Sequence, residues 1–393
     1  MLRGGFGTFF ERVQGNDVYN AALNPPFAYI PSANNVYFSN PNTSALTGAT
    51  TLNHFPSSLT NIKYNYPSPG TATFSMGIQR AVAPSVVFVL QYVGALGWDQ
   101  NDDRQINTLP LTDPNNAANP YDLRQGVANG KLNANEYRIY PGYAAVNQEE
   151  NETNFNYNSL QTGIRVENRY GLTTQVAYTW SHNISIVSND LNGLSNPFNA
   201  AYDRGSDTGF DRRNILNVSY IYAFPWFAKS HNMAARVFLG GWSISGITVA
   251  EAGTPVRVNY TGPDVLGLTA GSSRPNLVAK VTYPKSLNAW FSTSSFADPV
   301  APWNGGPNQG FGSAGKDAMV GPGIFNWNLS LFKSVPFTSH EGGPHLELRF
   351  ESYNTFNHFI PQGLDTNNHD GNFGFITSDY GPRTLQLGGQ IRF

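Results

Sequence analysis

The side chains that most often act in catalysis or bind metals are sparse in this sequence. None of the seven histidines forms the His-x-x-x-His or His-Glu-x-x-His spacing that would set two imidazoles on one helical face for zinc. Cysteine is absent, which removes disulfides, thiolate metal sites and cysteine nucleophiles together. Ser181 and His182 are neighbours, but adjacent side chains on a strand point to opposite faces. The sequence therefore predicts no catalytic residue, no cofactor and no metal site.

Two groups of charged residues leave their roles open. Asp99, Asp102 and Asp103 carry the hard carboxylate oxygens that calcium prefers, but they lack the glycine and the terminal glutamate of a calcium loop. A solvated loop is the favoured interpretation. The second group flanks a segment that returns into a strand. It either contacts a ligand or a plug or, in the interpretation that we favour, orders the loop root through salt bridges. This group comprises Asp203, Arg204, Asp211 and Arg212.

The composition is unusual for a soluble domain. The 393 residues include 26 Phe, 20 Tyr and 7 Trp, whereas only 13% are charged, against about a quarter in ordinary soluble domains. Mean hydropathy is nevertheless −0.34, because uncharged polar residues and glycine take the place of charges. The net charge of −2 gives no case for nucleic acid as a partner. This mixture suits a β-sheet with one apolar face and one polar, uncharged face.

No segment approaches the roughly 18 to 20 consecutive apolar residues of a membrane-spanning helix. The longest apolar stretches, such as residues 86–90, are far shorter. Since a bilayer core admits only helices or closed barrels, residence in a membrane would require a barrel. The evidence for a membrane-spanning barrel must therefore come from the pattern of strands.

Apolar and polar residues alternate along the whole chain, which is the pattern of a strand with two different faces. In residues 73–79, for example, Phe74, Met76 and Ile78 fall on one face and small or polar residues on the other. The same pattern predicts strands in residues 86–93, 164–167, 172–181, 216–224, 242–245, 325–331, 346–351 and 385–393. No segment shows a sustained helical periodicity. An all-β fold is the consequence.

The connections are of two lengths. Short turns are expected at residues 83–85 and 168–171. Long segments rich in Asn, Gly, Pro and Ser are predicted as loops, at residues 35–61, 99–133, 187–209 and 263–323. Short turns on one side and long loops on the other are typical of outer-membrane barrels.

The charged residues of the predicted strands lie on the face opposite the apolar set, as residues facing a barrel lumen would. Either they line a translocation path or they pair across neighbouring strands, and both interpretations stay open. The candidate lumen-facing residues are Arg165, Glu167, Glu347, Arg349 and Glu351.

Several motifs occur in a characteristic order: RGGFGTFFER at 3–12, NPPF at 24–27, YTWSH at 178–182, DRG at 203–205, FDRR at 210–213, LGGWSISG at 239–246, GTPV at 253–256, ESYNTFNH at 351–358, FGFIT at 373–377 and QIRF at 390–393. In this order they resemble the Oar-like branch of TonB-dependent receptors, which are large outer-membrane proteins with a carboxypeptidase-regulatory-like domain, a plug and a barrel. The resemblance spans nearly the whole chain, and the closing motifs are its most specific part.

The resemblance implies an antiparallel transmembrane β-barrel in the outer membrane of a Gram-negative cell, in contact with outer-membrane lipid. Residues 1–393 would form the C-terminal portion of a barrel of about 22 strands. Phe393, with Ile391 before it, resembles the terminal signal that the barrel-assembly machinery recognises. A signal peptide, plug and regulatory-like domain are not found in the sequence, so the TonB system would act only through a missing N-terminal part.

The function expected from the resemblance is that of the barrel portion of a TonB-dependent transporter for a bulky nutrient, such as a carbohydrate or a metal chelate. The candidate lumen-facing residues would then line the path or hold the plug. Two alternatives remain: an outer-membrane structural or adhesive barrel without transport, and a secreted soluble β protein that binds carbohydrate through its aromatic residues.

Overall fold

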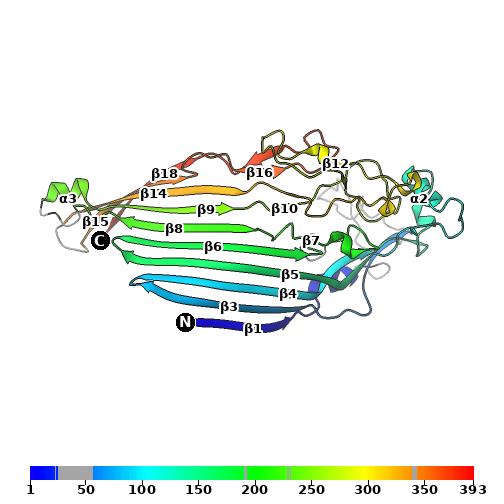
Figure 1. Cartoon of the computed structure of the whole chain (residues 1–393), viewed down its shortest axis with the longest axis horizontal. Coiled ribbons are helices and arrows are strands. Elements are labelled where there is room, and N and C mark those ends of the chain that lie inside the picture. The colour runs from blue at the N-terminus through cyan, green and yellow to red at the C-terminus, as the bar shows by residue number, and fades with distance from the viewer. Residues whose placement is uncertain (23, 25–55, 190–192, 228–229, 231, 339–342) are drawn as a thin grey trace, which may run out of the picture.

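The computed structural model describes residues 1–22, 24, 56–189, 193–227, 230, 232–338 and 343–393, and its dominant element is a 12-stranded sheet (Figure 1). Neighbouring strands along its main path pair antiparallel. In sheet order the strands are β1 (Leu2–Phe10), β3 (Gly70–Ala83), β4 (Val86–Gln105), β5 (Tyr143–Arg169), β6 (Leu172–Ser185), β8 (Asn214–Ala223), β9 (Trp242–Glu251), β14 (Ile324–Pro336), β15 (His345–Tyr353) and β18 (Thr384–Arg392).

Smaller strands and helices are attached to this sheet or lie in its connections. Two strands attach to it, β2 (Ser57–Ile62), parallel to β5, and β7 (Gly205–Ser206), antiparallel to β6. Three small sheets lie in the connections and pair β10 (Pro255–Val256) with β13 (Met319–Val320), β11 (Asn276–Leu277) with β12 (Phe296–Ala297), and β16 (Pro361–Leu364) with β17 (Ile376–Asp379). The helices are α1 (Gly15–Ala22), α2 (Asp122–Ala128) and α3 (Met233–Leu239), with the 3₁₀ turns η1 (Ala134–Glu136), η2 (Ala200–Asp203), η3 (Thr293–Ser295), η4 (Pro302–Asn304) and η5 (Asn308–Gly310).

The predicted strands are confirmed, and so is their two-faced character. Across β3, β4, β5 and β6 the register aligns large apolar residues that remain 39–61% exposed, namely Met76, Tyr92, Leu160 and Trp180. One residue further along each strand, Gly77, Gln91, Gln161 and Thr179 are aligned on the other face. We call these the apolar face and the polar face. Their separation follows from the period of two along each strand.

The two ends of the sheet differ as expected (Figure 1). At one end, the turn end, β3 passes to β4 through residues 84–85 and β5 to β6 through residues 170–171. Tyr170 and Gly171 both have positive φ, 54° and 84°, as a tight two-residue hairpin turn requires. A Cβ on Gly171 would lie 2.5 Å from the Ala223 carbonyl oxygen, so only glycine fits there. The other end, the loop end, carries the described residues of the longer connections, at 11–22, 56–69, 106–142, 186–189, 193–213, 252–323 and 354–383.

Some expectations fall outside the described residues, and two are wrong. Residues 57–61, predicted as the end of a loop, belong to β2, which pairs with β5. Residues 25–27 of the NPPF motif, 35–55 of the first loop and 190–192 of the third lie outside them. Asp99, Asp102 and Asp103 do not lie in a solvated loop, because β4 continues to Gln105. Asp102 pairs in register with Glu150 and Asp103 with Glu149, and both aspartates are buried. Cross-strand pairing thus overrides the low strand propensity of these residues.

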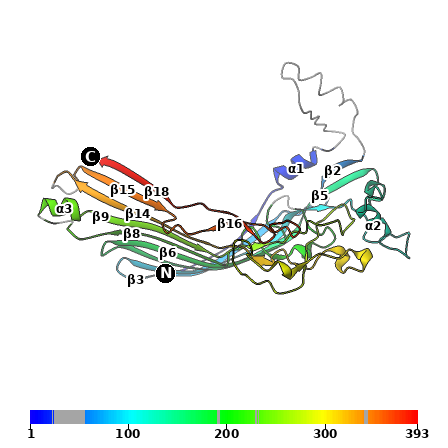
Figure 2. The same ribbon diagram turned by 90° about the horizontal axis from the view of Figure 1, so that it is seen from above.

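The sheet is a single curved layer (Figure 2). Its edges are β1 and β18, and the described strands do not close into a barrel. The buried apolar residues form clusters among the connections at the loop end, one around Leu109, Leu268 and Phe311 and another around Val258, Phe291 and Met319. No second sheet covers the apolar face within the described part of the chain, unlike the two packed sheets of a soluble sandwich. None of the helices described is long and apolar enough to span a bilayer.

Candidate functional site

The first pair of predicted loop-root charges is joined to other elements. Asp203 forms an ion pair with Arg274 from the 252–323 connection, at 3.2 Å between Oδ1 and Nη1, and both side chains are buried. The second oxygen of Asp203 accepts a hydrogen bond from the Ser195 backbone N–H at 2.6 Å. The Arg274 guanidinium lies 3.6 Å from the centre of the Tyr202 ring. Arg204 donates a hydrogen bond to the Asn154 side chain on β5.

The second pair connects the returning strand to its neighbours. Asp211 is buried, accepts a hydrogen bond from the Asn183 backbone N–H at 2.8 Å and pairs with Arg213 at 3.0 Å. Arg212 lies 3.1 Å from the carboxylate of Glu251 at the end of β9. The structure therefore brings all four predicted residues to one region, where β6, β8 and β9 meet the loops. Whether they also contact a ligand stays a prediction.

Lys316 is a charged residue of this region that the sequence did not indicate. Its ammonium donates to the Ser185 hydroxyl at 2.9 Å and to the Ile186 carbonyl at 3.0 Å. Burial lowers the pKa of Lys316 to about 8, although the carboxylates of Asp207, Asp203 and Asp317 act in the opposite direction. Lys316 lies in the segment GSAGKD at 312–317, which matches no functional motif, so the sequence could not have singled it out.

We expect Lys316 to make the stability of the loop end depend on pH. Because its pKa is about 8 when folded and about 10.5 in an unfolded chain, the unfolded state binds more protons between these values. The folded loop end should therefore gain up to about 3 kcal/mol as pH rises through this window. Urea midpoints can be measured at pH 8 and pH 10 by the fluorescence of Trp290 and Trp303. The midpoint of the wild type should be higher at pH 10 than at pH 8, and this difference should be much smaller in Lys316→Met. Equal shifts in both proteins would contradict this assignment.

Arg124 connects two of the long loops and was also missed. This buried α2 residue donates to the Leu266 carbonyl at 2.7 Å, to the Gln309 carbonyl and side chain at 2.7 Å each, and to the Leu111 carbonyl at 3.1 Å. Burial lowers its pKa to about 10. These contacts hold the 106–142 connection against the 252–323 connection. The arrangement is structural, since every donor contact described for Arg124 goes to the protein itself.

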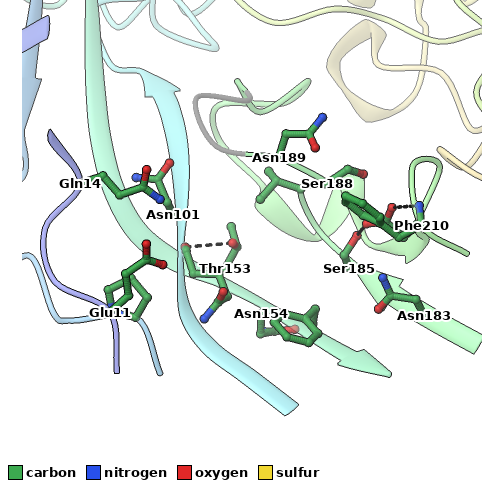
Figure 3. Close-up of a pocket in the computed structure, with 15 residues that line it drawn as sticks. Glu11, Gln14, Asn101, Thr153, Asn154, Asn183, Ser185, Ser188, Asn189 and Phe210 are labelled. Atoms are coloured by element: carbon green, nitrogen blue, oxygen red, sulfur yellow. Dashed lines mark hydrogen bonds between the residues drawn. The ribbon is translucent and has the colours of Figure 1, made fainter. Parts of the chain in front are cut away.

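A pocket of about 320 Å³ opens at the loop end (Figure 3). Glu11, Gln14 and Asn101 lie on one side, and Asn183, Ser188 and Phe210 lie on the opposite side. Phe155 and Ser185 are aligned on the polar face, because they occur an even number of residues from Gln161 and Thr179. The pocket therefore adjoins the loop-end margin of the polar face. Its other lining residues are Pro69, Gln100, Thr153, Asn154, Val187, Asn189 and Asp207.

The positions of both phenyl rings in this pocket have a structural cause. A Cβ on Gly97 would lie 2.1 Å from the Phe155 ring, so glycine at 97 leaves the space that the ring occupies. Phe210 is 64% exposed, and its backbone N–H donates to Asp207 Oδ1 at 2.8 Å. The other oxygen of Asp207 accepts a hydrogen bond from Ser185. Asp207 is therefore already engaged by the protein, and Phe210 is held at the pocket wall.

The candidate lumen-facing residues lie on the polar face but in two separate places. Arg165 and Glu167, near the end of β5, pair at 2.7 Å. On β15, Glu347 pairs with Arg349 at 2.7 Å and with Arg392 at 3.2 Å. Glu351 is aligned with Ser330 and Gln386. Strands β6, β8, β9 and β14 separate the two groups, so the structure does not bring them together.

The terminal residues lie at the open edge of the sheet. Ile391 in β18 is aligned with Leu346 of β15, and Phe393 follows the strand and is 99% exposed. Their role in assembly remains a prediction. Across the described residues, no group of three or more His, Asp or Glu side chains is placed to hold a metal ion.

A single-layer antiparallel sheet with an exposed apolar face, a polar face and long loops at one end defines an outer-membrane barrel protein. The chain belongs to the family of outer membrane β-barrel domains, whose model matches residues 1–386. The protein is therefore located in the outer membrane, and the soluble alternative is set aside.

Several solved structures of outer-membrane proteins are similar to this chain. They include the outer membrane transporter YddB from Escherichia coli, with 11% identity, a TM-score of 0.47, and coverage of 85% of this chain and 34% of that chain. FpvA of Pseudomonas aeruginosa bound to pyoverdines shows 10% identity, a TM-score of 0.39, and 99% and 30% coverage. The ferric-catecholate import receptor Fiu from Escherichia coli shows 8% identity, a TM-score of 0.40, and 99% and 32% coverage.

This chain thus spans about a third of the length of those structures. No curated protein sequence matches it.

Proposed function

We propose that the protein is the barrel portion of an Oar-like, TonB-dependent outer-membrane receptor that takes up a bulky nutrient. The supporting observation is the position of the pocket at the loop end. It lies at the loop end, on the margin of the polar face, where a ligand that enters between the loops would first meet the barrel wall. The proposed role is binding and passage without covalent chemistry.

The open edges of the sheet support a larger barrel. In a bilayer, each unpaired backbone group costs several kcal/mol, so a strand edge cannot remain exposed to lipid. Both β1 and β18 present such an edge among the described strands. We propose that further strands of a longer chain pair with them and complete a barrel of about 22 strands.

The polar face suggests how a ligand would pass. The aligned row of Gly77, Gln91, Gln161 and Thr179 is small or polar and uncharged. The charged pairs Arg165–Glu167 and Glu347–Arg349 lie nearer the turn end. In the proposal, a plug supplied by an N-terminal part occupies this face and rests on those charges, and the TonB system displaces it.

Uptake that depends on TonB is the test. Cells that contain the full protein should import a radiolabelled neutral oligosaccharide or a radiolabelled ferric chelate, and deletion of TonB should abolish import while surface binding persists. Loss of the protein should abolish both. If loss of the protein reduced cell attachment but left the import of every labelled compound unchanged, the structural or adhesive alternative would replace this proposal.

A further inference from the structure

The pocket at the loop end has a wall chemistry that selects among ligand classes. Six of its eleven polar lining residues carry amides, namely Gln14, Gln100, Asn101, Asn154, Asn183 and Asn189. Each amide offers both donors and acceptors, and so does each hydroxyl of a sugar. The volume of about 320 Å³ lies within the range of about 300–1,000 Å³ found for small-molecule sites.

The charges around this pocket disfavour an anion. Two carboxylates, Glu11 and Asp207, belong to the wall, and the described lining residues include no Lys, Arg or His. Two cations near the pocket have partners in the protein: Arg204 donates to Asn154, and Lys316 donates to Ser185 and Ile186. An anionic metal chelate would meet two carboxylates, and the described lining residues offer it no cation.

The two phenyl rings complete the arrangement. Phe155 lies against Gly97 on the polar face, and Phe210, in the segment 193–213, keeps most of its surface exposed. An exposed ring of this size gains free energy only when something apolar covers it. The C–H faces of a pyranose are apolar, whereas its rim carries hydroxyls. A sugar would cover the ring and donate a hydrogen bond to Asn183, whose buried Oδ1 accepts none from the described residues.

We propose that this pocket binds a neutral, polyhydroxylated ligand, namely a segment of an oligosaccharide. Phe210 supplies the apolar contact, and Asn183 and Gln14 supply hydrogen bonds from opposite sides of the pocket. The inference rests on the proposed function, because it names the nutrient class that the receptor would take up.

The test measures binding separately from transport. The full protein, purified in detergent, is applied to an array of neutral oligosaccharides and is titrated in parallel with ferric citrate and a ferric catecholate. We expect binding to a neutral oligosaccharide and none to the chelates. Phe210→Ala should weaken glycan binding about tenfold, while Phe210→Tyr should retain it.

A matched control lies in the same loop. Phe198 is 41% exposed and is outside the pocket lining, so Phe198→Ala should leave glycan binding unchanged. Chelate binding alone, no glycan binding, or equal loss in Phe210→Ala and Phe198→Ala would each overturn the inference. Glycan binding that requires Phe210, together with import that does not need TonB, would uphold this site and refute the proposed transport mechanism.

Discussion

Asp203→Ala is expected to destabilise the loop end by about 3–5 kcal/mol, because it leaves the Arg274 guanidinium buried without its counter-ion. Arg274 is 2% exposed, and its Nη1 lies 3.2 Å from the carboxylate that the substitution removes. The Ser195 backbone N–H would lose its acceptor as well. Hydrogen exchange of the amides in residues 195–206 should accelerate by several hundredfold if they open through this local unfolding.

An exposed pair in the same protein provides the control. Arg165 and Glu167 are 66% and 61% exposed and also form an ion pair, at 2.7 Å. Arg165→Ala should cost less than about 1 kcal/mol, because solvent already screens that pair. A second variant, Asp203→Asn, keeps the shape and should show an intermediate effect. If the amides of residues 195–206 exchanged no faster in Asp203→Ala than in Arg165→Ala, the Asp203–Arg274 ion pair would not order this loop.

Removal of Phe393 is expected to abolish most assembly into the outer membrane. Phe393 ends the apolar row of β18 and is almost fully exposed, so few contacts within the described structure explain its presence. We attribute its role to recognition by the barrel-assembly machinery. By contrast, Arg392 forms a half-exposed ion pair with Glu347 on the polar face, and such pairs contribute little.

The measurement is the yield of heat-modifiable protein in outer-membrane fractions, after expression with an export signal. Deletion of Phe393 should lower that yield at least tenfold, whereas Arg392→Ala should leave it near the wild-type value. Phe393→Tyr tests whether an aromatic terminus is enough. Equal yields from the deletion and from Arg392→Ala would show that Phe393 is not an assembly signal.

Most strands could be predicted because their signal is local. Each wall strand alternates within a few residues, as Phe74, Met76 and Ile78 do in β3, so no knowledge of the partner strand is needed. The loop-end half of β4 and β5 could not be predicted in this way. There, Arg104 and Lys63 pair with the buried Glu150, at 2.5 and 3.2 Å, and these contacts exist only after the strands align.

The candidate site, too, could be predicted only where its sequence signal is local. The four loop-root charges stood out because Asp-Arg neighbours flank a returning segment. Their partners Arg274 and Glu251 are distant in sequence, and no pattern connects them. The pocket draws on residues 11–14, on Pro69, on three strands and on residues 187–189 and 207–210. Asparagine and glutamine are common in these strands and loops alike, so the sequence alone does not show that they gather at one site.

The two-residue turns also determine the order in which the sheet can form. Joining β3 to β4 or β5 to β6 closes a very small loop, so those hairpins lose little chain entropy and can form within microseconds. Pairing β9 with β14 must first bring together segments separated by residues 252–323. Folding should therefore proceed by hairpins that arise early as units and then join edge to edge. The long connections at the loop end would acquire their buried ion pairs last.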